Sequence, residues 1–353
     1  MILVTGGAGF IGSEFVLQWI REEGTPIITL DKLTYAGNLI NLASLAENPL
    51  HTFVHADIAD RKTVSLLLEK HQPNSIIHCA AESHVDRSIT SPRAFIMTNI
   101  VGTSILLEEV LHYWQSLSSE KQKTFRFLYL STDEVYGSLD PEEKPAKENH
   151  SYAPNSPYAA SKASADHLVR AFNRTYNLPT ITSHSSNNFG PRQFPEKLIP
   201  LALFNALNEQ PIPLYGDGLN IRDWIFVEDH CRALRFILKN GVPGDSYNIG
   251  GNNEKTNLEL INEICRILDR IQPRKSNASH SELIQPVKDR LGHDRRYALD
   301  TSKLQNDLGW VHEDNFQANL HNTIKWYIEN PVWMEAMTSG AYQDWIKLYY
   351  TKE

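Results

Sequence analysis

The sequence has few cysteines, no excess of positive charge and no long apolar run, and each shortage argues against a class of protein. The three cysteines, Cys79, Cys231 and Cys265, lie far apart without C-x-x-C spacing, so they predict neither a disulfide framework nor a zinc knuckle. The net charge of -8 argues against general affinity for nucleic acid or anionic membranes. No stretch approaches the roughly 20 apolar residues of a membrane helix. The chain opens on a strand-like ILVTGG with no room for a signal peptide, so we expect a soluble, cytoplasmic protein. We also expect no metal site.

Short apolar segments alternate with amphipathic ones in the first half of the chain. This alternation is typical of a parallel sheet covered by helices on both faces. After Asn188 the sequence becomes richer in Pro, Gly and Asn. We predict an α/β protein with a Rossmann-like doubly wound parallel sheet and a smaller, mixed α/β C-terminal domain. Residues 1–188 form the nucleotide-binding domain, to which a segment near 220–250 returns, and residues 189–353 mainly bind substrate. The predicted strands are Ile2–Thr5, Pro26–Leu30, His51–Ala56, Ser75–Ala80, Phe125–Ser131 and Thr180–Ser185, and the polar stretch Gln272–Pro286 is predicted to be a surface loop.

A glycine-rich turn follows the first predicted strand. Gly6, Gly9 and Gly12 permit a tight turn, close approach of a pyrophosphate, and a helix whose N-terminal N–H groups are free. Asp31 ends the second strand, where its carboxylate can accept hydrogen bonds from adenosine ribose hydroxyls and repel a 2′-phosphate. The sequence therefore predicts NAD as the cofactor, although the neighbouring Lys32 argues in the other direction. Asp57 either contacts the adenine or caps the next helix.

Tyr158 and Lys162 lie four residues apart in a predicted helix, and Thr132 ends a strand upstream. A tyrosine acting as a base at neutral pH needs its anion stabilised, and a cation one helical turn away can do this. In a chain with this many tyrosines, about one Y-x-x-x-K pair is expected by chance, so the pair alone is weak evidence. The glycine turn upstream strengthens it. It is typical of enzymes that oxidise a carbinol.

Asp133 and Glu134 follow Thr132 directly, at the carboxyl end of a strand, where ligands bind in open parallel sheets. By themselves they have a simple structural interpretation, a helix N-cap followed by a first-turn acid. Beside a carbinol-oxidising pair they suggest chemistry as well. Oxidation of one sugar carbon to a ketone acidifies the proton on the next carbon, and a carboxylate with a neighbouring protonated carboxyl can then expel water.

Eight segments together resemble the dTDP-glucose 4,6-dehydratase family, in the nucleotide-sugar dehydratase branch of the extended short-chain dehydrogenases/reductases. The resemblance runs from residue 1 to about residue 330. The glycine turn and YAASK are shared across the wider superfamily, whereas the Asp-Glu pair is far more specific. The segments are TGGAGFIG, DKLTYAGN, AAESHVDRSI, STDEVYG, YAASK, SNNFGPRQFPEKLIP, IRDWIFVEDH and GHDRRYALD.

The resemblance implies a complete reaction, from dTDP-glucose to dTDP-4-keto-6-deoxyglucose and water. Tyr158 would take the proton of the 4-hydroxyl as hydride leaves C4 for NAD, with Thr132 hydrogen-bonded to that oxygen and Lys162 holding the nicotinamide ribose. Glu134 would remove the C5 proton and Asp133 would protonate the departing 6-hydroxyl. Return of hydride to C6 would regenerate NAD.

The resemblance also implies the residues that contact the ligands. Those for the cofactor are Gly6, Gly9, Phe10, Ile11, Gly12, Asp31, Lys32, Thr34, Asp57, Ile58, Ala80, Ala81, Ser83, Thr98, Tyr158, Lys162 and Asn188. Those for the substrate are Ser83, Thr132, Asn187, Lys197, Arg222, Asn257, Arg290 and His293. Guanidinium groups suit diphosphate oxygens, but the two arginines also have possible ion-pair partners in Asp223, Asp289 and Asp294.

The sequence departs from the family pattern at three positions. His184 stands where the family usually has arginine, Phe189 where it has tyrosine, and Leu291 where it has proline. None of these removes a reacting group. Leu291 is expected beside the nucleotide pocket, so the preference for thymine over uracil or cytosine stays open.

Other functions are compatible with part of this pattern. A nucleotide-sugar 4-epimerase or decarboxylase would share the glycine turn and the Tyr158–Lys162 pair, but not the adjacent acids. A dehydratase acting on UDP- or CDP-glucose would share the glycine turn, the Tyr158–Lys162 pair and the adjacent acids. A non-catalytic NAD-binding protein would not need four reacting residues. The family also implies a homodimer, formed through helices such as Ile100–Leu111 and Ala163–Tyr176, and a product that feeds rhamnose and other deoxysugars.

Overall fold

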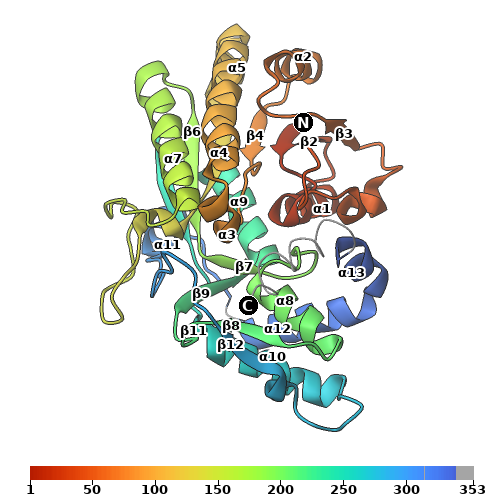
Figure 1. The fold of residues 1–353 in the computed structure, drawn as a ribbon. Coiled ribbons are helices and arrows are strands. Elements are labelled where there is room, and N and C mark those ends of the chain that lie inside the picture. Colours follow the sequence, from red (N-terminus) through yellow and green to blue (C-terminus); the bar gives the residue numbers. More distant parts are fainter. Residues whose placement is uncertain (314, 339–353) are drawn as a thin grey trace.

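The computed structural model describes residues 1–313 and 315–338, so residues 339–353 of the predicted substrate domain lie outside it. Its centre is a seven-stranded parallel sheet in the order β10-β6-β5-β4-β1-β2-β3 (Figure 1). The six predicted strands are confirmed to within two residues at either end. The strands are β1 (Ile2–Thr5), β2 (Ile27–Asp31), β3 (His51–His55), β4 (Ser75–His78), β5 (Arg126–Thr132), β6 (Thr180–Ser185) and β10 (Ser246–Ile249).

The two faces of this sheet are covered by different helices, because successive side chains of each strand point to opposite faces. Ile2 and Val4 of β1 pack with one set of helices, whereas Leu3 between them packs with the other. The first set is α1 (Phe10–Glu23), α9 (Val227–Asn240) and α11 (Ser302–Leu308), and the second is α2 (Arg61–His71), α5 (Thr103–Ser116) and α7 (Pro157–Tyr176). The doubly wound Rossmann-like sheet predicted from the sequence is therefore confirmed.

One continuous helical stretch, Pro92–Ser116, is long and apolar enough to cross a membrane by length and composition alone. It comprises α4 (Pro92–Phe95), the π-helix η2 (Ile96–Gly102) and α5. The sequence analysis missed it because Arg93 and two glutamates interrupt the apolar run. Half of its most apolar window is buried inside the protein, where Leu106, Leu107 and Val110 pack against the sheet. A core helix passes the same test.

A second group of elements lies beside the carboxyl ends of the sheet strands (Figure 1). Its core contains Phe189, Trp224, Leu260 and Ile324. The strands are β7 (Asn187–Phe189), β9 (Ile221–Phe226) and β11 (Glu254–Thr256) in one sheet, and β8 (Ile212–Tyr215) with β12 (Ile284–Val287) in another. The helices are α8 (Leu198–Leu207), α10 (Asn257–Ile271), α12 (Phe316–Glu329) and α13 (Pro331–Thr338). The shorter elements are η1 (Leu39–Leu45), α3 (Val85–Thr90), α6 (Ser119–Thr124), η3 (Asp133–Tyr136) and, beside α10, η4 (His280–Leu283).

The prediction that Gln272–Pro286 is a loop was wrong at its C-terminal end. His280–Leu283 forms a turn of 3-10 helix, and Ile284–Val287 pairs in parallel with β8. The polar composition of this segment gave no sequence signal for these elements. A short edge strand needs few apolar side chains when its backbone hydrogen bonds are satisfied by a neighbouring strand. His280 is buried and accepts or donates a hydrogen bond at 2.6 Å to Asp269, which fixes the turn to α10.

Candidate active site

A cavity of about 410 Å³ runs between the carboxyl ends of the sheet strands and the second group of elements. Every residue that the sequence analysis nominated lines this cavity. They are Gly6, Gly9, Phe10, Ile11, Gly12, Asp31, Lys32, Thr34, Asp57, Ile58, Ala80, Ala81, Ser83, Thr98, Thr132, Asp133, Glu134, Tyr158, Lys162, Asn187, Asn188, Lys197, Arg222, Asn257, Arg290 and His293. Segments nearly 300 residues apart in sequence thus share one site.

The glycine turn has the close packing that a dinucleotide needs. Gly6 has a positive φ of 69°, and a Cβ at Gly12 would lie 2.2 Å from the carbonyl oxygen of Gly6, so neither position tolerates a side chain. Gly9 is the N-cap of α1 and offers no side-chain acceptor, which leaves the first N–H groups of the helix available to a ligand. A pyrophosphate fits this cradle.

Asp31 lies at the end of β2 and is held by backbone groups rather than by a cation. Its two carboxylate oxygens accept hydrogen bonds from the N–H groups of Ala8 at 2.9 Å and Leu33 at 2.8 Å. The ammonium group of Lys32 instead lies 2.6 Å from Asp57, so Lys32 is already paired. Asp57 does not cap α2, because Asp60 accepts the hydrogen bond from Thr63 N–H. This arrangement favours ribose hydroxyls over a phosphate.

Tyr158 and Lys162 come from the first turns of α7, whose register is set by Ser156 at the N-cap and Pro157 at N1. Lys162 Nζ donates to the Leu130 carbonyl oxygen at 2.6 Å. Burial lowers the pKa of Lys162 to about 8. Burial also raises the pKa of Tyr158, with a further rise from Glu134, and a hydrogen bond with Thr132 opposes it. The hydrogen bond with Thr132 thus favours the Tyr158 anion, and the role of Lys162 in stabilising that anion stays a prediction.

Asp133 and Glu134 begin the 3-10 turn η3 after β5. Thr132 is the N-cap, since its hydroxyl accepts from Glu134 N–H at 3.3 Å and donates to Asp133 at 3.2 Å. The capping interpretation therefore holds for Thr132, while both acids line the cavity. Burial and the adjacent Glu134 raise the pKa of Asp133 well above its ordinary value. Burial also raises the pKa of Glu134, but Arg290, Arg222 and Lys197 oppose that rise. The two carboxyls are electrostatically unequal.

The cationic end of the cavity is built around Arg222 and Arg290. The guanidinium of Arg222 donates to the carbonyl oxygens of Ile221 at 2.7 Å and Asp294 at 2.9 Å, and it lies 4.3 Å from the Tyr297 ring centroid. Arg290 lies 3.3 Å from a carboxylate oxygen of Asp86. The anticipated ion pairs with Asp223, Asp289 and Asp294 therefore do not form. Within residues 1–313 and 315–338, no carboxylate forms an ion pair with Arg222.

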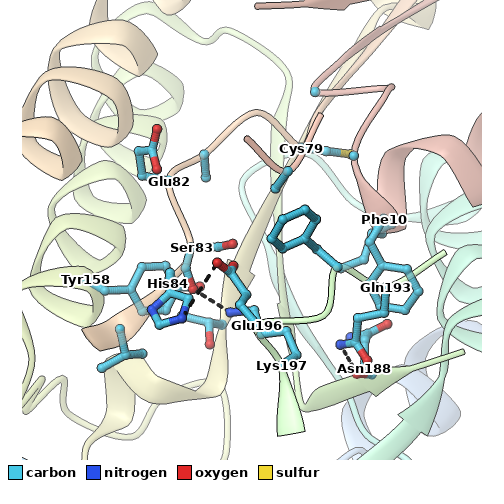
Figure 2. A pocket seen from close by; sticks show the side chains of 18 of the residues that line it. Phe10, Cys79, Glu82, Ser83, His84, Tyr158, Asn188, Gln193, Glu196 and Lys197 are labelled. Atoms are coloured by element: carbon cyan, nitrogen blue, oxygen red, sulfur yellow. Dashed lines mark hydrogen bonds and ion pairs between the residues drawn. The ribbon is translucent and has the colours of Figure 1, made fainter. Parts of the chain in front are cut away.

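His293 and Lys197 complete this end of the cavity. His293 Nδ1 lies 2.6 Å from Asp289, and burial with two nearby guanidinium groups lowers the pKa of His293 to about 4. Lys197 Nζ donates to the carbonyl oxygen of Ser83 at 2.7 Å (Figure 2). At neutral pH the charge here comes from arginine and lysine, and His293 contributes a neutral ring.

The sequence analysis missed a buried acid beside Lys197. Glu196 lies 3.6 Å from His84 Nε2, accepts from the Tyr35 hydroxyl at 3.2 Å, and faces the cavity (Figure 2). Burial raises the pKa of Glu196 to about 7. Glu196 stands next to Lys197 in the segment SNNFGPRQFPEKLIP, and this position could have indicated that it lines the site. The other lining residues that were missed include His84, Asp86, Gln193, Phe194, Tyr215 and Tyr297.

This combination of fold, dinucleotide cradle and Tyr-Lys pair defines a short-chain dehydrogenase/reductase. Residues 3–323 match the family described as GDP-mannose 4,6 dehydratase. The chain belongs to this family.

Comparison with individual proteins narrows the relationship. The dTDP-glucose 4,6-dehydratase of Shigella flexneri is 51% identical over 99% of this chain and 98% of its own length. A crystal structure of a double mutant of the dTDP-glucose 4,6-dehydratase from Streptomyces venezuelae, with NAD bound, has a TM-score of 0.86 at 42% identity, covering 96% of this chain and 99% of that one. A UDP-glucose 4-epimerase from Thermotoga maritima has a TM-score of 0.80 at 28% identity, covering 94% and 99%. The dehydratases are the more similar.

Proposed function

We propose that this chain is a dTDP-glucose 4,6-dehydratase, an NAD-dependent hydro-lyase that forms dTDP-4-keto-6-deoxyglucose and water. The single observation that carries this proposal is the pair of adjacent, unequal carboxyls, Asp133 and Glu134, in the same cavity as Tyr158. The full-length relatives that share about half of the sequence carry the same activity in their names. Crystal structures of such dehydratases contain NAD, and the glycine cradle and Asp31 fit that cofactor here.

The residues of the chain divide the proton transfers among them. Bound NAD supplies a hydride acceptor for C4 and, in its reduced form, a hydride donor for C6. Tyr158 removes the proton of the sugar 4-hydroxyl, and Thr132 shares a hydrogen bond with the Tyr158 phenol. Lys162 adds positive charge and would hold the nicotinamide ribose. The chain thus holds the carbinol proton at a tyrosine oxygen rather than in solvent.

Elimination of water needs a base and an acid at neighbouring carbons. Glu134 is the base for the C5 proton, because three cations hold its pKa down relative to that of Asp133. Asp133 is the acid for the 6-hydroxyl, since burial and the Glu134 charge favour its protonated form. Its second carboxyl oxygen is buried and has no hydrogen-bond partner among residues 1–313 and 315–338, so it is available to a substrate hydroxyl.

The diphosphate of the substrate fits the cationic end. Arg222 has no carboxylate partner among the described residues, and Arg290 and Lys197 line the same region. Ser83, Asn187, Asn257 and His293 supply further polar contacts, consistent with their place on the cavity wall. Planar guanidinium groups bind phosphate oxygens in pairs, which gives orientation as well as affinity.

The experiment that tests the function is turnover in deuterated water with dTDP-, UDP- and CDP-glucose offered in parallel. We expect the dTDP-sugar to be the best substrate and its 4-keto-6-deoxy product to carry deuterium at C5, because Glu134 exchanges its proton with solvent before reprotonation. Mass spectrometry and proton NMR of the product measure this. Product without label at C5 contradicts the Glu134 assignment, a preference for another base corrects the substrate, and a 4-epimer identifies an epimerase.

We further propose that the enzyme works in the cytoplasm as a homodimer and that its product feeds rhamnose or another deoxysugar. Ile96 and Met97 of η2 are about half exposed, at 47% and 48%, next to α5, and a dimer formed through α5 and α7 would cover apolar surface of this kind. Light scattering of the purified protein tests the dimer, and a monomeric mass at micromolar concentration rejects it.

A further inference from the structure

Helix α13 docks on the segment that holds the glycine turn. Trp333 Nε1 donates a hydrogen bond to Asn41 Oδ1 at 2.8 Å, and Trp333 is only 5% exposed. Met337 follows one helical turn later on the same face of α13, and its sulfur lies 3.8 Å from Asn38 Nδ2. In Figure 1, α13 is the blue helix drawn below α1. A helix from the second group of elements thus contacts η1 and its N-cap residue, Asn38.

Both asparagines bond to one atom of the glycine turn, the carbonyl oxygen of Ala8. That oxygen accepts the backbone N–H of Asn38 at 3.0 Å and Nδ2 of Asn41 at 2.9 Å. The N–H of Ala8 donates to Asp31 Oδ2 at 2.9 Å. Ala8 directly precedes Gly9, the N-cap of α1. Three hydrogen bonds therefore fix the glycine turn at the point where the helix begins.

The orientation of the Asn41 amide is set by its two partners. A carbonyl oxygen only accepts and an indole N–H only donates, so Nδ2 faces Ala8 and Oδ1 faces Trp333. Asparagine supplies both functions on one short side chain, whereas aspartate would lose the donor and alanine would lose both. All three residues are buried, so a hydrogen bond lost here leaves an unsatisfied polar group.

Trp333 also packs on α12. Its ring centroid lies 5.3 Å from that of Trp326 and 5.8 Å from that of Tyr327, both edge to face. The Tyr327 hydroxyl donates to the Gln193 carbonyl oxygen at 2.8 Å, and Gln193 Nε2 donates to the Asn188 carbonyl oxygen at 2.9 Å. Gln193 and Asn188 line the cavity. Trp333 thus belongs to a continuous set of contacts that joins the cavity wall to the glycine turn.

We propose that Asn41 and Trp333 are positioning residues for NAD, because docking of α13 holds the glycine turn in the shape that receives the pyrophosphate. Within residues 1–313 and 315–338, neither side chain lines the cavity, so both act through Ala8. A turn that is already fixed loses less conformational freedom when NAD binds, which raises the affinity. The inference rests on the proposed function only in the place of the pyrophosphate, and it does not depend on which nucleotide sugar is turned over.

Calorimetric titration of the full-length protein with NAD, after removal of bound cofactor, tests the proposal. Trp333→Phe removes the indole donor and keeps an aromatic ring, so we expect the Kd for NAD to rise about fivefold, as for the loss of one buried neutral hydrogen bond. Asn41→Ala removes both hydrogen bonds of the amide and should raise the Kd about tenfold. At saturating NAD, kcat should stay close to the wild-type value, because neither side chain touches Tyr158 or the acid pair. An unchanged Kd in both variants would overturn the proposal.

The double variant Asn41→Ala/Trp333→Phe separates a relay from two independent packing losses. If the indole acts through Asn41, the Kd of the double variant should equal that of Asn41→Ala, about tenfold above the wild type, because the indole has no partner left to lose. Independent effects would multiply to about fiftyfold and would overturn the proposal.

Trp114→Phe is the matched control for Trp333→Phe. The indole N–H of Trp114 donates to the Gln122 carbonyl oxygen at 3.2 Å, and among the described residues Trp114 is not part of the cavity wall. This variant loses the same kind of hydrogen bond but should leave the Kd for NAD unchanged. An equal rise in the Kd in both tryptophan variants would show a general effect of lost packing and would reject the relay.

Hydrogen exchange of the wild-type protein gives a second test that holds even where a variant fails to fold. Coupling between NAD and the docking of α13 is reciprocal, so NAD should slow amide exchange in α13 by at least about fivefold, as read by peptide mass spectrometry. Unchanged exchange in α13 together with slower exchange in the glycine turn would overturn the proposal. Unchanged NAD affinity in Gly12→Ala would instead reject the cofactor cradle of the proposed function.

Discussion

The two ends of the cavity are built in different ways. The cofactor end is made of strand ends and backbone groups from the first hundred residues, such as the Gly6–Gly12 turn and Asp31. The substrate end is made of long charged side chains from the second half of the chain, such as Arg222 and Arg290, which are held by carbonyl oxygens and by Asp86. Steric fit dominates the first end and charge dominates the second. Substitutions at the cofactor end should therefore act through steric clash, and substitutions at the substrate end through loss of charge.

The largest effect is expected from a change at the cofactor end, Gly12→Ala. A Cβ there would lie 2.2 Å from the carbonyl oxygen of Gly6 and 2.8 Å from Gly7 Cα, and backbone cannot easily move away. Overpacking of this kind costs about 1–3 kcal/mol or more, and the backbone shift that relieves it displaces the turn that binds the pyrophosphate. NAD affinity should therefore fall by more than about 100-fold, and activity with it. Calorimetric titration with NAD measures the loss.

Gly24→Ala, at the other end of α1, is the matched control for Gly12→Ala. Gly24 has a positive φ of 58°, so alanine there is strained, but nothing lies within 4 Å of its Cβ position. It should lower thermal stability slightly and leave NAD affinity intact. Equal NAD affinities in the two alanine variants would contradict the steric account of the glycine turn.

Between the two ends, Asp133→Asn tests the division of labour in the acid pair. The amide cannot protonate the 6-hydroxyl, so dehydration should slow by about 100-fold, within the usual range for a general acid. Oxidation at C4 needs only Tyr158 and the cofactor, so reduced NAD should accumulate transiently and be visible by its absorbance near 340 nm in a stopped-flow experiment. An unchanged dehydration rate would remove Asp133 from this role.

The smallest effect is expected at the substrate end, from Arg222→Gln. This change removes one of several cations around the diphosphate, so the KM for the nucleotide sugar should rise by about tenfold, or roughly 1.4 kcal/mol. NAD affinity should not change. Arg222→Lys keeps the charge but loses the planar donors, and we expect an intermediate KM. A fall in NAD affinity in Arg222→Gln would mean that the two ends are not separable.

Prediction from sequence was most successful where function depends on local backbone. The glycine turn, the strand-end acids and the Tyr158–Lys162 spacing all lie within short segments whose geometry follows from the residues themselves, and these residues line one cavity in the structure. The short strand Ile284–Val287 and the buried stretch Pro92–Ser116 were missed, because edge pairing and burial depend on neighbours that are distant in sequence. For the same reason the partner of Arg290 is Asp86, about 200 residues away, and not the adjacent Asp289.

The sequence by itself determined the parallel sheet, the dinucleotide turn and the candidates for the reacting groups, because each is a property of local spacing. Only the tertiary structure decided how those groups are charged. Burial raises the pKa values of Asp133 and Tyr158 and lowers that of Lys162, and the remote cations Arg222, Arg290 and Lys197 set Glu134 apart from its neighbour. Desolvation and through-space charge depend on what surrounds a side chain once the chain has folded.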